Sequence, residues 1–364
     1  MSGCCSSKDN DGDSSIKYEN NSIVGGEWVM GKIDTLVGSI PKVSIKLSLK
    51  DRISSWKVRW GINRMNYRID PGIYAVGEPD ASSYVLVTAN YKLSFDMLRR
   101  ELKARSLWIL VLDTRGVNVW CAAGKGTFGT DELVKQVLNS RLSELVSHRT
   151  IILPQLGAPG VSAYEFQQRT GFKVIYGPVR ASDINEFFSN SMVATTEMRK
   201  VNFNLYDRLI LIPIELVGAL KMAFIIIGTL FLFNLIMLHT FDKGVFTIID
   251  IHGFLGALAV GCILVPLLLP WIPTKSFALK GWLIGLLWAI MFSIWFGVFT
   301  YDSFRFWSYI FILPAISAYF SVNFTGSSTY TSFSGVLKEM RIAIPGIILS
   351  VVVGFILVLI GVFK

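Results

Sequence analysis

The sequence predicts an α/β domain followed by an all-α transmembrane domain of five helices. From Gly72 onward, apolar β-branched runs alternate with polar stretches whose apolar residues recur at helical spacing. After Arg208 only eight of the 35 basic and five of the 26 acidic residues remain, and long apolar stretches recur. The first pattern favours a doubly wound (Rossmann-like), mainly parallel sheet, and the second favours helices that cross a membrane.

Four buried strands are predicted in the α/β part, at residues 83–88, 107–112, 150–153 and 173–176. None alternates between apolar and polar residues, which is typical of parallel strands covered on both faces. Amphipathic helices are predicted between and after them, at residues 93–104, 131–146, 162–170 and 182–190.

The chain is predicted to have four parts. Residues 1–22 are rich in Ser, Asp and Asn, lack the pattern of a signal peptide, and predict a disordered leader. Residues 23–71 predict an irregular N-terminal extension with a strand-like stretch at 43–49. Residues 72–200 form the α/β domain, and residues 201–364 the transmembrane domain.

Five membrane spans are predicted, at residues 216–238, 253–271, 281–299, 306–324 and 342–363. The loops on the side of the α/β domain carry more Lys and Arg than those on the other side, so the α/β domain is expected to be cytoplasmic. The chain is therefore expected to be an integral protein of the cell's inner membrane. Glu215 and Lys221, at the start of the first span, are expected to reach the interface.

The net charge of +9 does not indicate nucleic-acid binding, because basic and acidic residues are mixed and no basic run is interleaved with aromatic residues. A basic face near anionic lipid explains the excess more simply. Four cysteines, two of them adjacent at Cys4 and Cys5, give no disulfide framework, which favours a reducing compartment.

Ligands of open parallel sheets bind at the carboxyl ends of the strands, so the loops that follow the strands are the candidate binding segments. These are residues 89–91, 114–125, 155–160 and 177–180. The second loop is much longer than the roughly two to six residues that are usual there, and long loops are often functional.

The long loop continues into Asn118-Val-Trp-Cys-Ala-Ala-Gly-Lys-Gly-Thr-Phe-Gly129. It is not an ordinary phosphate loop, because Val119 stands where the first glycine is needed and Gly126 where a hydroxyl residue is needed. Gly124, Gly126 and Gly129 spell G-x-G-x-x-G, but the motif lies too far from its strand for a dinucleotide turn.

Cys121 lies at the centre of this loop. A cysteine nucleophile needs a nearby base, and the one histidine of the α/β part, His148, lies beyond the next helix. The small residues Ala122, Ala123 and Gly124 would let a broad, flat ligand approach, with the thiolate as a soft axial metal ligand. A buried structural cysteine is the alternative.

The stretch NVWCAAGK resembles the signature of the corrinoid protein of the microbial mercury-methylation pair. YAVGEPD, VLVTANYKLSFDMLRREL, YGPVRASDI, NFTGSSTYTS and the five-span anchor are also similar to that family. The resemblance implies that Cys121 is the catalytic residue and the lower axial ligand to the corrinoid cobalt, on a cap helix that Asn118 holds. It implies a cofactor-binding set of Thr88, Asn118, Val119, Trp120, Cys121, Ala122, Ala123, Gly124 and Lys125.

This resemblance further implies a corrinoid-dependent methyltransferase that takes a methyl group from a methylated folate and passes it to Hg(II), forming methylmercury. The implied partners are a small ferredoxin with two clusters, which reduces cobalt and delivers Hg(II), a methylated folate or its methyltransferase, and the lipid bilayer. The α/β part also resembles the corrinoid-binding part of the corrinoid iron-sulfur protein. This chain lacks four clustered cysteines, so no iron-sulfur cluster is expected in it.

Two alternatives stay open. The chain is a corrinoid methyltransferase with a different acceptor, or it is a non-catalytic membrane scaffold that binds another flat ligand. The residues alone do not identify mercury.

Overall fold

A computed structural model describes residues 26–328 and 333–364. The described chain forms two compact units, residues 26–202 and residues 203–364. The predicted leader at residues 1–22 and the first three residues of the predicted extension lie outside the described residues.

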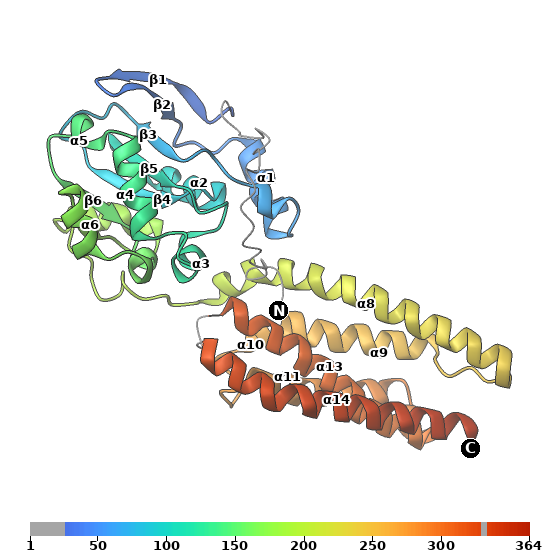
Figure 1. Ribbon diagram of the computed structural model, residues 1–364. Coiled ribbons are helices and arrows are strands. Elements are labelled where there is room, and N and C mark those ends of the chain that lie inside the picture. Colours follow the sequence, from blue (N-terminus) through green and yellow to red (C-terminus); the bar gives the residue numbers. More distant parts are fainter. Residues whose placement is uncertain (1–25, 329–332) are drawn as a thin grey trace. The chain divides into compact units, whose positions relative to one another are not determined.

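The first unit contains a seven-stranded sheet in the order β1-β2-β3-β5-β4-β6-β7 (Figure 1). Strands β5, β4, β6 and β7 are parallel to one another, as predicted, whereas β3 runs antiparallel to β5. β2 pairs parallel with β3, and β1 pairs antiparallel with β2. The strands are β1 Val29–Thr35, β2 Gly38–Val43, β3 Gly72–Val76, β4 Val85–Ala89, β5 Leu107–Leu112, β6 Thr150–Leu153 and β7 Lys173–Tyr176.

The N-terminal segment from residue 26 is regular, in contrast to the irregular extension that the sequence predicted. β1 and β2 widen the sheet, followed by helix α1 (Leu49–Arg59) and the short turn η1 (Arg64–Asn66). The predicted strand at residues 43–49 is mostly the connection from β2 to α1. This connection ends at Ser48, because Ser48 and Asp51 form a capping box that satisfies the first amide groups of α1.

Helices cover both faces of the sheet (Figure 1). α4 (Thr130–Asn139), α5 (Leu142–Leu145) and α6 (Ala163–Thr170) contribute to the hydrophobic core on one face. α2 (Lys92–Glu101) and α7 (Ile184–Ser189), which follows the turn η3 (Ala181–Asp183), contribute to the core on the other. The single helix predicted at residues 131–146 is two helices, because Arg141 adopts a left-handed conformation with φ of 48°.

A buried cluster of four charged side chains joins α1 to α2. Lys92 and Arg99 of α2 each contact both Asp51 of α1 and Asp96 of α2, with nitrogen–oxygen distances of 2.6–2.8 Å. Arg99 also donates to the backbone carbonyl groups of Ser44 and Lys46. Burial alone would raise the pKa of Asp51, but the hydrogen bond and charge of Lys92, with Ser48 and Arg99, lower it to about 2.

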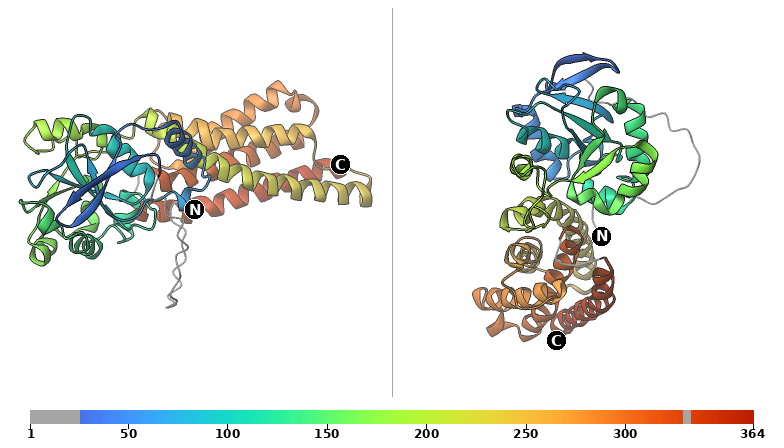
Figure 2. Two further views of the ribbon diagram at one scale, coloured as in Figure 1. Left: turned by 90° about the horizontal axis from the view of Figure 1, so that it is seen from above. Right: turned by 90° about the vertical axis from the view of Figure 1, so that its left-hand side faces the viewer.

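The second unit has five helices that are long and apolar enough to cross a membrane, as predicted. They lie side by side as a bundle (Figure 2). The first span begins earlier than predicted, because an Asn204–Asp207 capping box starts its helix at Leu205. The elements are α8 Leu205–Phe241, α9 Ile248–Ala259, the π-helical turn η4 Val260–Leu264, α10 Val265–Leu268, α11 Phe277–Trp295, α12 Val298–Tyr301, α13 Ser303–Asn323, η5 Phe324–Ser327 and α14 Phe333–Phe363.

Small residues allow three of these helices to approach closely. Gly281 and Gly285 of α11 lie so near Ser317 of α13 that a Cβ atom at either glycine would overlap it. Gly261 of η4 faces the backbone of the same serine. Glu215 of α8, which was expected to reach the interface, is instead buried in the bundle.

Candidate functional site

The long loop after β5 contains a six-residue helix, α3 (Val119–Gly124). Asn118 precedes it in an extended conformation, and its side-chain oxygen accepts a hydrogen bond from the backbone N–H of Cys121 at 2.9 Å. Asn118 is therefore the N-cap that starts the helix, a residue type strongly preferred at this position. The predicted loop is long because it carries this extra helix between β5 and α4.

The two faces of α3 differ in exposure. Val119, Ala122 and Ala123 are buried in the core of the sheet, whereas Trp120 is 44% exposed and Cys121 is half-buried. The sequence interpretation placed Ala122 and Ala123 on the surface that receives a ligand. The structure places them beneath the helix, where their small side chains seat it on the core.

The outer end of α3 is open. Gly124 and Lys125 are exposed, and no atom would contact a Cβ at Gly124. Gly126 follows with φ of +79°, a left-handed conformation that glycine adopts without strain. Trp120, Cys121, Gly124 and Lys125 thus have exposed surface, while the other predicted residues of α3 anchor it.

α3 packs against the turn η2 (Gln155–Gly160), which follows β6. A Cβ atom at Gly160 would lie 3.0 Å from the Cα atom of Ala123 and would overlap the carbonyl oxygen of Phe128. The loops after β5 and β6, both predicted as binding segments, are therefore in contact. The backbones of Gly160 and Ala123 come so close that larger side chains at these positions would overlap neighbouring atoms.

Asn90, in the loop after β4, organises the turn that leads into α3. Its side-chain oxygen accepts hydrogen bonds from the backbone N–H groups of Thr114 and Gly116 and from the Thr114 hydroxyl, at 2.9–3.1 Å. Its side-chain nitrogen donates to Asp113 at 2.9 Å. The sequence interpretation included this loop but did not single out Asn90. Its position directly after a buried strand was the available signal.

Thr88 is buried near the carboxyl end of β4. Its neighbours Val87 and Ala89 belong to the core that also contains Ala122 and Ala123, whereas Leu86 belongs to the core on the other face. Since side chains alternate along a strand, Thr88 lies on the face of Leu86. Thr88 therefore lies on the face of the sheet opposite to the one that α3 packs against.

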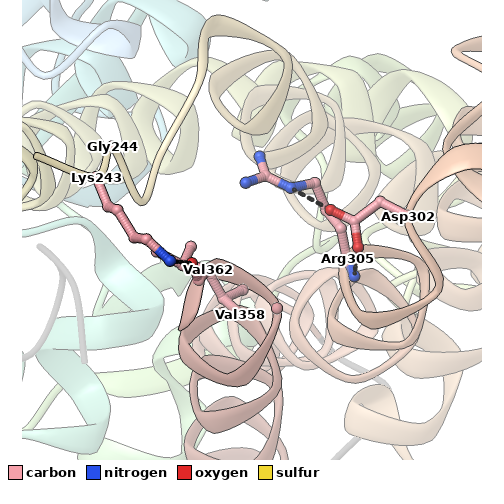
Figure 3. A pocket seen from close by; sticks show the side chains of 7 residues that line it. Lys243, Gly244, Asp302, Arg305, Val358 and Val362 are labelled. Atoms are coloured by element: carbon pink, nitrogen blue, oxygen red, sulfur yellow. Dashed lines mark hydrogen bonds and ion pairs between the residues drawn. The ribbon is translucent and has the colours of Figure 1, made fainter. Parts of the chain in front are cut away.

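Two cavities lie outside α3. One of about 460 Å³ in the α/β unit is lined by Gly72, Asp113, Lys135 and neighbouring residues. One of about 310 Å³ lies at an end of the helical unit, where Lys243 donates to the Val362 carbonyl and Arg305 pairs with Asp302 (Figure 3). No residue of the predicted cofactor-binding set lines either of them.

The described residues contain no group of three or more His, Cys, Asp or Glu that could hold a metal ion. A metal at α3 would therefore need its other ligands from a cofactor. A corrinoid macrocycle supplies these equatorial ligands itself, and Cys121 offers soft sulfur on a rigid, half-exposed helix. The donor set of α3 fits such a group.

Comparisons with known proteins also relate the α/β unit to a corrinoid protein. Residues 62–188 match the family described as CO dehydrogenase/acetyl-CoA synthase delta subunit. The acetyl-CoA decarbonylase/synthase complex subunit gamma of Methanopyrus kandleri is 33% identical over 122 residues, which are 33% of this chain and 26% of that protein. The corrinoid/iron-sulfur protein large subunit of Moorella thermoacetica is 29% identical over 122 residues, or 33% of this chain and 27% of that protein.

The chain thus spans about a quarter of the length of the curated relatives that it matches. The family match begins after α1 and ends near the end of α7, so it covers the strands β3 to β7 together with α3. The α/β unit therefore contains a domain homologous to acetyl-CoA decarbonylase/synthase gamma subunits and to the large subunit of a corrinoid/iron-sulfur protein.

Proposed function

We propose that this chain is a membrane-anchored, corrinoid-dependent methyltransferase in which Cys121 is the lower axial ligand. The observation that carries the proposal is the position of Cys121. It lies on the half-exposed face of a helix that follows a parallel strand, in a domain related to a corrinoid/iron-sulfur protein. A bound corrinoid would supply the cobalt that accepts a methyl group and gives it up.

The residues of α3 have distinct tasks in this proposal. Asn118 fixes the start of the helix and so the direction of the Cys121 side chain. Val119, Ala122 and Ala123 hold the helix on the core, so that the Cys121 side chain is already positioned before a ligand binds. Trp120, Gly124 and Lys125 provide exposed surface beside the thiolate for the macrocycle and its polar substituents.

The position of sulfur is directly measurable. The full chain, reconstituted with cobalamin in detergent, is compared with Cys121→Ala by X-ray absorption at the cobalt edge and by visible absorption. We expect a cobalt–sulfur neighbour in the wild type that is lost in Cys121→Ala and retained in Cys262→Ala, which changes a cysteine of the helical unit. Retention of the sulfur signal in Cys121→Ala would exclude Cys121 as the ligand.

The acceptor that we propose is Hg(II), on the basis of the NVWCAAGK resemblance. The Cys121 sulfur would hold the cobalt of a bound corrinoid, and a soft, electron-rich ligand of this kind would favour delivery of a methyl group to a soft electrophile. The test supplies the loaded, purified chain with Hg(II), with thiols and with arsenite, and measures the methylated products. Methylmercury as the main product supports Hg(II) as the acceptor. Preference for another acceptor would reject Hg(II) and keep only the proposal that the chain is a corrinoid methyltransferase.

The proposed donor is a methylated folate or its methyltransferase, and the proposed reductant is a small two-cluster ferredoxin. The proposed location is the inner membrane with the α/β unit in the cytoplasm, as the Lys and Arg bias of the loops favours. Protease accessibility of the α/β unit in vesicles of known orientation tests the location. A colourless purified chain that binds no cobalamin would favour the alternative of a non-catalytic scaffold.

A further inference from the structure

Helix α1 exposes an apolar stripe. Leu49 is 76% exposed, Ile53 51% and Trp56 60%, although all three are large and apolar. They are spaced at i, i+4 and i+7, so at about 100° per residue they lie on one narrow face. Trp60, one turn further on, continues the stripe, and its ring centroid lies 5.6 Å from that of Trp56.

Basic residues flank this stripe on both sides. By helical geometry Lys50 and Lys57 lie on one side of it, and Arg52 and Arg59 lie on the other. Lys50, Arg52 and Lys57 are exposed. Among the described residues, Lys50 forms an exposed pair with Glu27 at 4.0 Å, a separation at which surface pairs contribute little.

The one acidic residue of α1 faces the other way. Asp51 is 7% exposed and is neutralised by Lys92 and Arg99. Val58, on the same inner face, is 2% exposed. The inner face of α1 is therefore fixed on the α/β unit, and the helix cannot rotate to bury its stripe.

The segment after α1 extends the same surface. Ile62 is 55% exposed and Met65 is 62% exposed, and the basic Arg64 lies between them. The exposed surface of residues 49–66 thus combines large apolar side chains with cations and no exposed carboxylate. The family match begins only at residue 62, so α1 lies outside the region shared with the corrinoid relatives.

We propose that α1 is a membrane-surface helix, which lies in the interface of an anionic bilayer with its stripe toward the acyl chains. An apolar stripe with Trp, bordered by Lys and Arg, is the pattern of helices that lie in the plane of an interface. The cations complement acidic phospholipid headgroups, and Trp favours the headgroup level. The described part of the same chain contains five helices that are long and apolar enough to cross a membrane, so a bilayer would lie within reach of the chain.

The test uses the full chain in lipid nanodiscs that contain a phospholipid with a photoreactive acyl chain. After illumination, mass spectrometry measures lipid adducts on the peptide that covers residues 49–66. In discs with phosphatidylglycerol we expect adducts on this peptide at least tenfold above those on peptides of α4 and α6. Those helices carry the matched exposed apolar residues Leu138 (60% exposed) and Tyr164 (76% exposed).

Two variants separate the apolar and the electrostatic contributions. Ile53→Ser with Trp56→Ser should remove most adducts, while Leu138→Ser with Tyr164→Ser should leave them unchanged. Lys57→Gln should lower them about fivefold in anionic discs. The electrostatic contribution can also be tested with the unmutated chain. Replacing phosphatidylglycerol by phosphatidylcholine, or raising salt from about 50 mM to about 500 mM, should lower adduct formation on residues 49–66.

An adduct level on residues 49–66 equal to that on α4 and α6 in anionic discs would overturn the proposal. So would adducts that are insensitive to the Ile53 and Trp56 changes. Cross-links from α1 to protein in place of lipid would show that another polypeptide surface covers the stripe, which also rejects the membrane assignment.

Discussion

Helices α1 and α3 are both additions to the alternating strands and helices of the α/β unit, and they are fixed to it by opposite means. α3 is seated by small apolar residues, and the side-chain oxygens of Asn118 and Asn90 accept hydrogen bonds from its Cys121 amide and from the Gly116 amide of the preceding turn. α1 is held by a buried cluster of ionised side chains. The comparison teaches that α3 is held mainly by packing, whereas α1 is held by the buried Val58 and also by the charge of Asp51, which titrates at low pH.

The largest effect is expected for Asp51→Asn. The change leaves Lys92 and Arg99 buried with half of their carboxylate partners, and breaking a buried pair in this way costs about 3–5 kcal/mol. Hydrogen–deuterium exchange of α1 and α2 amides in the full chain measures the loss. Glu101→Gln, in the exposed pair with Arg100, is the control and should change protection little. Equal effects of the two changes would show that the cluster does not hold α1.

The second effect concerns α3 and is expected for Gly160→Ala. The added Cβ would overlap the Phe128 carbonyl and press on Ala123, and overpacking of this kind costs about 1–3 kcal/mol. The displaced α3 should also bind cobalamin more weakly, as measured by visible absorption of the reconstituted chain. The control change Gly31→Ala, on β1 and away from the proposed site, meets no atom and should leave both properties intact. Normal cobalamin binding by Gly160→Ala would contradict close packing of α3 against η2.

The third effect separates the two helices by pH. The pKa of Asp51 is about 2 in the folded chain, below the 3.8 that is usual for an aspartate exposed to solvent, so its charge stabilises the fold fully above pH of about 4. As pH falls toward about 2, roughly 2 kcal/mol of this stabilisation should be lost. Exchange protection should therefore fall in α1 before it falls in α3. The Asp51→Asn variant should lack this difference, and its persistence there would assign the acid response to another group.

The smallest effect is expected for Asn118→Ala, which removes the N-cap of α3 and should cost about 1 kcal/mol. The Cys121 amide, which loses its hydrogen-bond acceptor, should exchange faster, and Asn118→Asp should restore its protection. An unchanged exchange rate in Asn118→Ala would show that packing of Val119, Ala122 and Ala123 on the core is enough to position the helix.

The parallel half of the sheet could be predicted because its strands are mostly apolar runs, and all but the edge strand β7 are largely buried. Strands at 107–112, 150–153 and 173–176 have the predicted bounds. β1 and β2 could not be predicted, because both strands mix polar and apolar residues, and their place in the sheet depends on the pairing of β2 with β3, some thirty residues further along the chain. The break at Arg141 was missed because no glycine or proline marks it.

The sequence proposed which residues form the candidate site, but it did not predict which of them are exposed and which are buried. The unusual length of the loop and its Cys121 motif indicated where to look. The sequence could not tell which small residues face a ligand and which face the core, since alanine suits both. Asn90 escaped notice because its function is to satisfy backbone groups of a turn that has no recognisable pattern of its own.

The close glycine contacts of α11 with α13 have a consequence for how the helical unit tolerates change. In the most apolar 18-residue stretch of each helix, 61% of α13 is buried inside the unit, against 11% of α14. Mutational tolerance in this half of the chain should therefore be uneven. A methyl group added on α11 at Gly281 or Gly285 meets protein atoms, whereas most of α14 can drift in sequence so long as it remains apolar enough for lipid.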